Sequence, residues 1–313
     1  MDKRVYGVLG ISSIRANWNA DFSGYPKTLS DGTISGSDKS FKYPMKKMWD
    51  NEGKKILYIK SMTIKANDKK GEAALIPRTL RERYEFLFGA DDMKDVKKVL
   101  TNLMSADDVK NFGATFAEAG CNIAITGAVQ IGQGINKYED AAVTEQPILS
   151  PFRDGTAKKG GESEDAKNST IGTKIMTDEA HYFYPFVINP SAYKELVALG
   201  VTEGYTEEDY AEFKRAAMSA ATAYDTNSKS GCENELAVFI ETEPSVYLPN
   251  LSEYVSFAKG EDKNTISLEF GSILEAMGSR IKSVEIYYNT HTTKLTGSVP
   301  KAKLFDIMTQ QEV

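Results

Sequence analysis

Histidine and cysteine are scarce in this sequence, with two of each among 313 residues. Cys121 and Cys232 form no CxxC pair, and one pair of cysteines cannot build a disulfide framework. His181 and His291 are too few for a metal site of several histidines, although one histidine could still act as a general base. A packing or surface role fits both histidines better. We therefore expect no bound metal and no other cofactor.

Long apolar runs are absent as well. No stretch approaches the roughly 18 residues that a membrane-spanning helix needs. Residues 1–4 lead directly into a strand-like segment, without the apolar stretch and cleavage site of a signal peptide. These absences predict a cytoplasmic protein with no membrane partner and with two reduced thiols.

Recognisable catalytic motifs are also missing. The Gly132-Gln133-Gly134 run does not complete a GxGxxG motif, because the next required glycine is replaced by Lys137. The sequence has no Walker-type, GxSxG or HExxH motif. Pairs and triplets of acidic residues stand where helices are expected to start, and helix capping explains them. We therefore predict a protein that is not an enzyme.

Charge is distributed unevenly along the chain. The net charge is −6, but residues 1–70 hold 14 Lys and Arg against 7 Asp and Glu, whereas residues 71–313 hold 24 against 37. This asymmetry favours a local anion-binding surface in the N-terminal part. An acidic surface that meets a basic neighbour, or an unevenly solvated surface, would give the same pattern.

Hydrophobic patterning predicts one α+β domain over residues 1–313. Strands are expected near residues 4–12, 54–62, 121–132, 181–189 and 235–243. Helical spacing marks residues 37–49, 72–104 and 206–224, and the polar, glycine-containing residues 150–180 predict a flexible insertion such as a hairpin. Without insertions the order approximates βαββαβ, the pattern of ferredoxin-like and RNA-recognition folds.

The predicted helix at 37–49 is basic. Its lysines, which could share a face or lie beside it, are Lys39, Lys42, Lys46 and Lys47. Such a face either contacts phosphates or is simply solvated. Because no RNP1-like stretch of aromatic residues is present, any bound RNA is expected to be held through its backbone.

Two short motifs follow one another in the middle of the chain. Residues 108–116 read DVKNFGATF, and residues 125–132 read ITGAVQIG. Together they resemble the hallmark of the CRISPR-associated DevR-type backbone subunits of the RAMP superfamily, roughly DVRxFGA followed by a strand with TGPVQ. Lys110 replaces the arginine of that pattern and Ala128 replaces its proline.

Three further segments extend this resemblance over most of residues 4–244. Residues 11–27 fall where the family has its first loop in contact with crRNA, and residues 37–49 match its basic helix. Residues 170–174, TIGTK, resemble the (M/I)GxK segment that closes a flexible hairpin. The type I-B, Csh-like branch fits the length and motifs best.

The resemblance implies an RRM-like palm, a helical fingers insertion at about residues 63–118 and a flexible hairpin thumb at about residues 148–180. Copies of the chain would form a filament along one crRNA in a type I Cascade complex, together with other Cascade subunits. Each thumb would displace a base, and the remaining guide bases would pair with target DNA in antiviral defence.

The resemblance also suggests which residues meet the RNA. Loop and helix residues would hold phosphates, the strand near 130 would meet the sugar–phosphate chain, and the thumb would supply a wedge in Met176. The full set is Arg15, Asn17, Lys27, Lys39, Lys42, Lys46, Lys47, Gln130, Gly132, Arg153, Lys174 and Met176.

Two alternatives stay open at this point. Related type III backbone subunits cleave RNA with an acidic loop residue, and Asp21, Asp31 or Asp38 could take that role. The second alternative is an acidic structural or interaction protein unrelated to CRISPR systems.

Overall fold

A nine-stranded mixed sheet forms the centre of the molecule. The computed structural model describes residues 1–67, 72–90, 92–153 and 168–313. β1 (Arg4–Ala16) lies between β10 (Asn168–Ile188) and β11 (Cys232–Thr242) and is antiparallel to both. The remaining strands are β14 (Ile281–Tyr288) and β16 (Ala302–Asp306) beyond β11, and β7 (Val129–Ile131), β8 (Gly134–Asn136), β9 (Val143–Arg153) and β2 (Ser35–Gly36) on the side of β10.

β1 is buried on both sides because both faces of the sheet are covered. Its side chains Val5 and Leu9 point into one apolar cluster, and Tyr6 and Val8 point into another. Gly7 is required at the crossing of the three central strands, since a Cβ there would lie 1.8 Å from the carbonyl oxygen of Val238. The near-continuous apolar run of β1 reflects this double burial.

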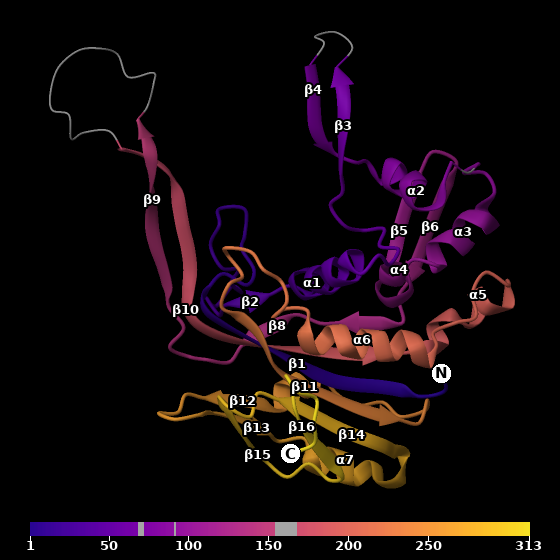
Figure 1. The fold of residues 1–313 in the computed structure, drawn as a ribbon. Helices are drawn as coiled ribbons and strands as arrows, with labels where there is room; N and C mark the ends of the chain where they lie inside the picture. Colours follow the sequence, from indigo (N-terminus) through magenta and orange to yellow (C-terminus); the bar gives the residue numbers. More distant parts are fainter. Residues whose placement is uncertain (68–71, 91, 154–167) are drawn as a thin grey trace, which may run out of the picture.

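Two helices cover the first face of the sheet, as Figure 1 shows: α1 (Asp38–Asn51) and α6 (Glu207–Ser219). Phe41, Met45 and Trp49 of α1 are buried at helical spacing in the cluster that also holds Phe213 of α6. Both helices begin where the sequence predicts, because Ser37 and Thr206 cap the free backbone N–H groups of the first turn.

The second face is covered by a C-terminal layer that the sequence did not predict. It consists of β12 (Val255–Ala258), β13 (Asn264–Leu268), β15 (Thr293–Thr296) and α7 (Gly271–Met277). Ile266, Leu268 and Leu274 of this layer join Tyr6 and Val8 in the second cluster. These elements are too short for a clear period in the sequence.

The strand predicted at residues 54–62 does not exist as such. Leu57 and Tyr58 donate their backbone N–H groups to the Asp108 carboxylate, each at 2.8 Å, and the carbonyl of Ile56 accepts from Arg83. Side chains thus satisfy the backbone groups that a neighbouring strand would otherwise bind. In the central sheet, β7 is one of the strands that pair with β10.

The strand predicted at residues 121–132 is two strands in different sheets. β6 (Cys121–Thr126) pairs with β5 (Gly113–Glu118) in a separate two-stranded sheet, and β7 joins the central sheet. The chain turns at Gly127, where a Cβ would lie 2.2 Å from the carbonyl carbon of Phe112. Alternation is correct in both halves, but a period of two cannot reveal a change of partner.

The insertion after α1 is only partly helical. Its helices are α2 (Leu80–Phe88), α3 (Val96–Met104) and α4 (Asp107–Phe112). Residues 72–77, expected to be helical, form β4 (Glu72–Pro77), which pairs with β3 (Met62–Asn67). Cross-strand partners such as Ile64 and Leu75 favour this hairpin over a helix.

Two hairpins project from the same side of the central sheet as α1, as Figure 1 shows. One is β3–β4, and the other is formed by β9 and the first half of β10, from the pair Val143 and Thr177 to the pair Arg153 and Asn168. The second occupies the predicted thumb region, of which residues 154–167 lie outside the described part. The shorter elements are α5 (Lys194–Ala198) and the 3₁₀ turns Pro190–Tyr193, Leu251–Tyr254 and Gly278–Arg280.

Candidate nucleic-acid interface

A cleft of about 520 Å³ lies between α1 and the segment at residues 112–115. Lys39, Lys42 and Lys46 line it from α1, at the three- and four-residue spacing that places side chains on one helix face. The opposite wall consists of Tyr58, Phe112, Gly113, Ala114 and Thr115, with Asp38 and Tyr43 completing the lining. The basic helix and the motif at residues 108–116 therefore meet at one site.

Phe112 forms an aromatic floor beneath two of these lysines. The Nζ atoms of Lys42 and Lys46 lie 5.2 and 5.8 Å from the centroid of its ring. The ring also stacks on Trp49, with 5.9 Å between centroids. A ring face attracts cations without neutralising their charge, so Phe112 orients the lysines and leaves them available to an anion.

Gly113 lets the chain leave α4 and enter β5 directly behind this floor. Its φ of +81° lies in the left-handed region, and a Cβ would come 2.2 Å from the carbonyl oxygen of Ile125. The residue must therefore be glycine for both conformational and steric reasons. This explains why glycine follows phenylalanine in the motif at residues 108–116.

Asp108 is the buried anchor of the cleft. Its side chain is fully shielded from solvent and lies 3.6 Å from Nζ of Lys46, in addition to accepting the two backbone N–H groups of residues 57 and 58. Burial lowers the pKa of Lys46, and the Asp108 carboxylate partly offsets that effect. Burial also raises the pKa of Tyr58 to about 12, reinforced by the same carboxylate. Tyr58 is thus a neutral hydroxyl that donates to the carbonyl of Thr115 at 2.7 Å.

The four predicted lysines of α1 differ in their surroundings. Lys39 is exposed and has no ion-pair partner among the described residues, whereas Lys42 pairs with Asp38 at 2.8 Å. Lys47 pairs with Asp50 at 3.2 Å and lines a separate groove against the residues that follow α6, not the cleft. The structure therefore brings together Lys39, Lys42 and Lys46 and separates Lys47 from them.

The first loop contributes two exposed cations and one structural amide. Arg15 is exposed at the end of β1 with a φ of +51°, and Lys27 is exposed farther along. Asn17 is buried, and its Nδ2 donates to the carbonyls of Gly24 at 2.9 Å and Ile175 at 3.2 Å. Asn17 therefore fastens the loop to β10, an interaction that its sequence neighbourhood did not reveal.

The predicted thumb residues lie at different points of the β9–β10 hairpin. Lys174 is half-buried on β10, opposite Gln146. The wedge candidate, Met176, is 8% exposed in this conformation, opposite Thr144. Arg153 ends β9, where its backbone pairs with that of Asn168.

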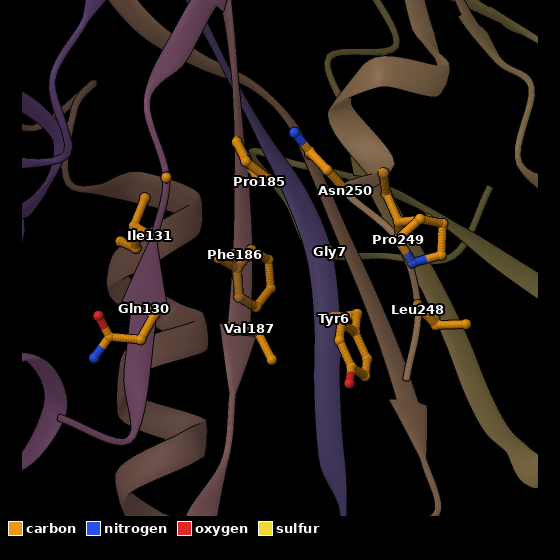
Figure 2. Close-up of a pocket in the computed structure, with 12 residues that line it drawn as sticks. Tyr6, Gly7, Gln130, Ile131, Pro185, Phe186, Val187, Leu248, Pro249 and Asn250 are labelled. Carbon is orange, nitrogen blue, oxygen red and sulfur yellow. The ribbon is translucent and has the colours of Figure 1, made fainter. Parts of the chain in front are cut away.

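Gln130 and Gly132 lie on the other side of the sheet from the cleft. Gln130 is paired with Val187 and Val187 with Tyr6, and Tyr6 belongs to the second core cluster. Figure 2 shows these residues across a groove of about 400 Å³ that is closed by Leu248 and Pro249. Nε2 of Gln130 donates to the carbonyl of Gly127, and the Gly132 amide donates to Pro185. The structure does not bring these two residues together with the lysines.

The aspartates of the nuclease alternative each hold a local structure. Asp21 accepts the backbone N–H groups of Ser23 and Tyr25, and Asp31 accepts that of Thr33. Hydrogen bonds from Thr33 lower the pKa of Asp31. Within the described residues, no group of three or more His, Cys, Asp or Glu side chains is arranged to hold a metal ion. None of the helices in those parts is long and apolar enough to cross a membrane.

Tyr58 and Phe112 are the site residues that sequence reasoning missed. Tyr58 stands in an apolar run that favours a core strand, and Phe112 stands inside the quoted motif without an assigned role. Only their packing against Lys46 reveals them. The available signal for Phe112 was an aromatic residue inside a motif of a chain that also carries a lysine-rich helix.

Comparison with known proteins places this geometry in a family. A solved structure described as "CRISPR RNA-guided surveillance complex, pre-nicking" has the same fold, with a TM-score of 0.54 and 13% identity over 98% of this chain and 96% of that chain. Another, described as "CRISPR RNA-guided surveillance complex", aligns with a TM-score of 0.47 and 13% identity over 94% and 95% of the two chains. A search of curated proteins finds no match. The family described as "CRISPR-associated protein Cas7" matches residues 3–273, and the chain therefore belongs to that family.

Proposed function

We propose that the chain is a crRNA-binding backbone subunit of a type I CRISPR surveillance complex. The observation that carries this proposal is the cleft in which Lys39, Lys42 and Lys46 line one wall and Phe112 forms the floor. Three ammonium groups along one helix match the phosphates of a single strand, and their charge supplies affinity without reading sequence. Base edges then remain available to pair with target DNA.

The ion pairs of the cleft support an exchangeable binding surface. Asp38 is half exposed, with 38% side-chain exposure, whereas Lys42 retains 14%. Because Asp38 is open to solvent, a phosphate that approaches from that side can take the place of its carboxylate on Lys42. Lys46 stays fixed by Asp108 and acts as a permanent part of the wall.

The rest of the fold supports a palm with two extensions. The antiparallel order β11-β1-β10-β7, with α1 between β1 and β7 and α6 between β10 and β11, supports the proposal of an RRM-like palm. In this proposal the insertion with β3–β4 acts as fingers and the β9–β10 hairpin as a thumb that folds over RNA. Copies of the chain would assemble along the guide with other Cascade subunits in the cytoplasm, and type I-B is the proposed subtype.

We assign the chain no catalytic role. The support is that Asp21 and Asp31 each cap a turn and that Asp38 pairs with Lys42. Incubating the RNA-loaded protein with complementary RNA and a divalent metal ion should leave that RNA intact. Periodic cuts that disappear on replacing one of these aspartates by alanine would overturn this assignment in favour of the nuclease alternative.

Co-expression with a repeat–spacer array tests the binding role. The protein should purify with RNA of discrete length and as a large oligomer, and a K39E/K42E double variant should lose the RNA. The matched control is K47E, on the same helix but outside the cleft, which should retain it. Unmodified protein that emerges free of RNA and monomeric would contradict the proposal.

A further inference from the structure

Phe22 stands apart from every other apolar side chain in the described residues. Its exposure is 112%, as high as in an extended chain, whereas the next most exposed large apolar side chains are Ile64 at 74% and Tyr247 at 71%. A phenylalanine left in water forgoes about 1.5–3 kcal/mol of burial free energy. A ligand that covers this ring would recover that free energy.

Hydrogen bonds hold the turn that carries Phe22. Asp21 accepts the N–H groups of Ser23 at 2.8 Å and Tyr25 at 3.0 Å, and its own N–H donates to the carbonyl of Tyr25 at 2.7 Å. Gly24 completes the turn with a φ of +89°. Phe22 is therefore held outward by a hydrogen-bonded loop.

Two contacts fasten this turn to the β9–β10 hairpin. The Tyr25 hydroxyl donates to the Glu145 carboxylate on β9 at 2.5 Å, and Asn17 bridges the carbonyls of Gly24 and Ile175. Ile175 faces the turn, since its Cδ1 lies 3.5 Å from the Cβ position of Gly24, and Glu145 is its partner on β9. The aromatic ring thus stands on a turn that is fixed to the hairpin which the proposed function makes the thumb.

The base of the loop is joined to the lysine end of the cleft. Asn19 accepts the N–H of Ser37, the cap of α1, at 2.7 Å, and Trp18 packs edge-on against Phe41, with 6.2 Å between centroids. Lys39 is two residues beyond that cap. Figure 1 shows the loop before β2 rising between α1 and the β9–β10 hairpin. A strand that leaves the cleft past Lys39 reaches the loop directly.

The surroundings of Phe22 select the kind of ligand. Its neighbours in sequence, which are Ala20, Asp21, Ser23 and Gly24, add no large apolar side chain to the ring. Protein interfaces bury contiguous apolar patches around their aromatic anchors. A nucleobase can stack on a single exposed ring among polar groups, because every base has a π-face and stacking does not depend on sequence.

We infer that Phe22 stacks on one base of the RNA strand that leaves the α1 cleft, once per subunit. The inference rests on the proposed function. It adds a base contact to a site that otherwise binds only the sugar–phosphate backbone of the RNA. Because stacking tolerates all four bases, the contact leaves the guide free to vary.

The experiment uses full-length protein and a short oligouridine that carries 2-aminopurine at one position, moved along the strand in a series. Wild-type protein should quench the fluorescence at one position, and F22A should remove that quenching. F22A should also weaken binding by about 5- to 150-fold, the equivalent of about 1–3 kcal/mol for one stacked base. F22W should restore both signals. The control, Y247A, removes an aromatic from the segment that covers the other face of the sheet and should change neither.

Four outcomes would overturn the inference. F22A that binds with wild-type affinity and quenching shows that the ring contacts no base. F22A that leaves affinity unchanged but reduces oligomer size assigns the ring to a protein contact. If K39E/K42E abolishes binding while F22A does not alter it, the inference fails and the proposed function stands. If wild-type protein binds no oligouridine, both fail.

Discussion

Replacing Asp108 tests whether one buried carboxylate builds the cleft. Alanine removes the acceptor of two backbone N–H groups, each at 2.8 Å, and leaves Lys46 without the anion that lies 3.6 Å away. Hydrogen bonds to a charged acceptor contribute about 1.5–3 kcal/mol each, and breaking a buried ion pair costs about 3–5 kcal/mol. These effects overlap, since they share one side chain, so we expect Asp108→Ala to lower the free energy of unfolding by about 3–5 kcal/mol.

Asparagine refines the test because it keeps one acceptor oxygen and loses the charge. Asp108→Asn should cost about half as much, roughly 1.5–2.5 kcal/mol, and should remain folded. The control is the neighbouring Asp107, which is partly exposed and lies 3.8 Å from Lys54, so Asp107→Asn should cost less than about 1 kcal/mol.

Urea denaturation followed by circular dichroism measures these differences, with RNA affinity determined in parallel. Asp108→Asn should also weaken RNA binding, since Tyr58 and Lys46 lose their fixed positions, whereas Asp107→Asn should not. Equal stabilities for the two asparagine variants would refute the reasoning that Asp108 organises residues 57 and 58.

Three further predictions concern charge, protonation and backbone. Replacing Lys42 by Glu should reduce the slope of log affinity against log salt by about one, while K47E leaves it unchanged; equal slopes would remove the cleft from the binding site. Burial would lower the pKa of His181, but the Glu235 and Glu179 carboxylates outweigh it and raise the pKa. His181 should therefore stabilise the fold below its unfolded pKa of about 6.5, and this contribution should be lost as pH rises through the raised value; unfolding of H181Q that follows the same pH dependence as wild type would contradict this. Gly113→Ala should cost at least about 1–3 kcal/mol, more than Gly53→Ala, which shares a positive φ but has no atom within 4 Å of its Cβ position.

Periodic patterns in the sequence located the elements that bury one continuous face. β1, β10 and β11 lie where strands are predicted near residues 4–12, 181–189 and 235–243, and α1 and α6 lie where helices are predicted. Their caps and apolar spacing are local signals, so a single sequence carries them.

Signals that depend on a distant partner were not visible. The apolar run at residues 54–62 has strand-like composition, but a carboxylate about 50 positions later binds its backbone. The alternation at residues 121–132 does not show that its two halves join different sheets. Gln130 has the sequence context of the family motif, yet strand pairing turns it away from the lysines. In each case the sequence shows the side chain but does not show which distant residue it contacts.

The central position of β1 also governs how the chain is made. Val5 pairs with Ile188 on one side and with Glu241 on the other, so β1 is synthesised long before either of its partner strands. At about 5–20 residues per second, a ribosome needs on the order of tens of seconds to deliver β11. During that interval an apolar strand with two unpaired edges is exposed, and sheets built from such distant pairings close slowly. Early aggregation during synthesis is therefore the characteristic hazard of this fold, and slower expression at lower temperature should raise the yield of folded protein.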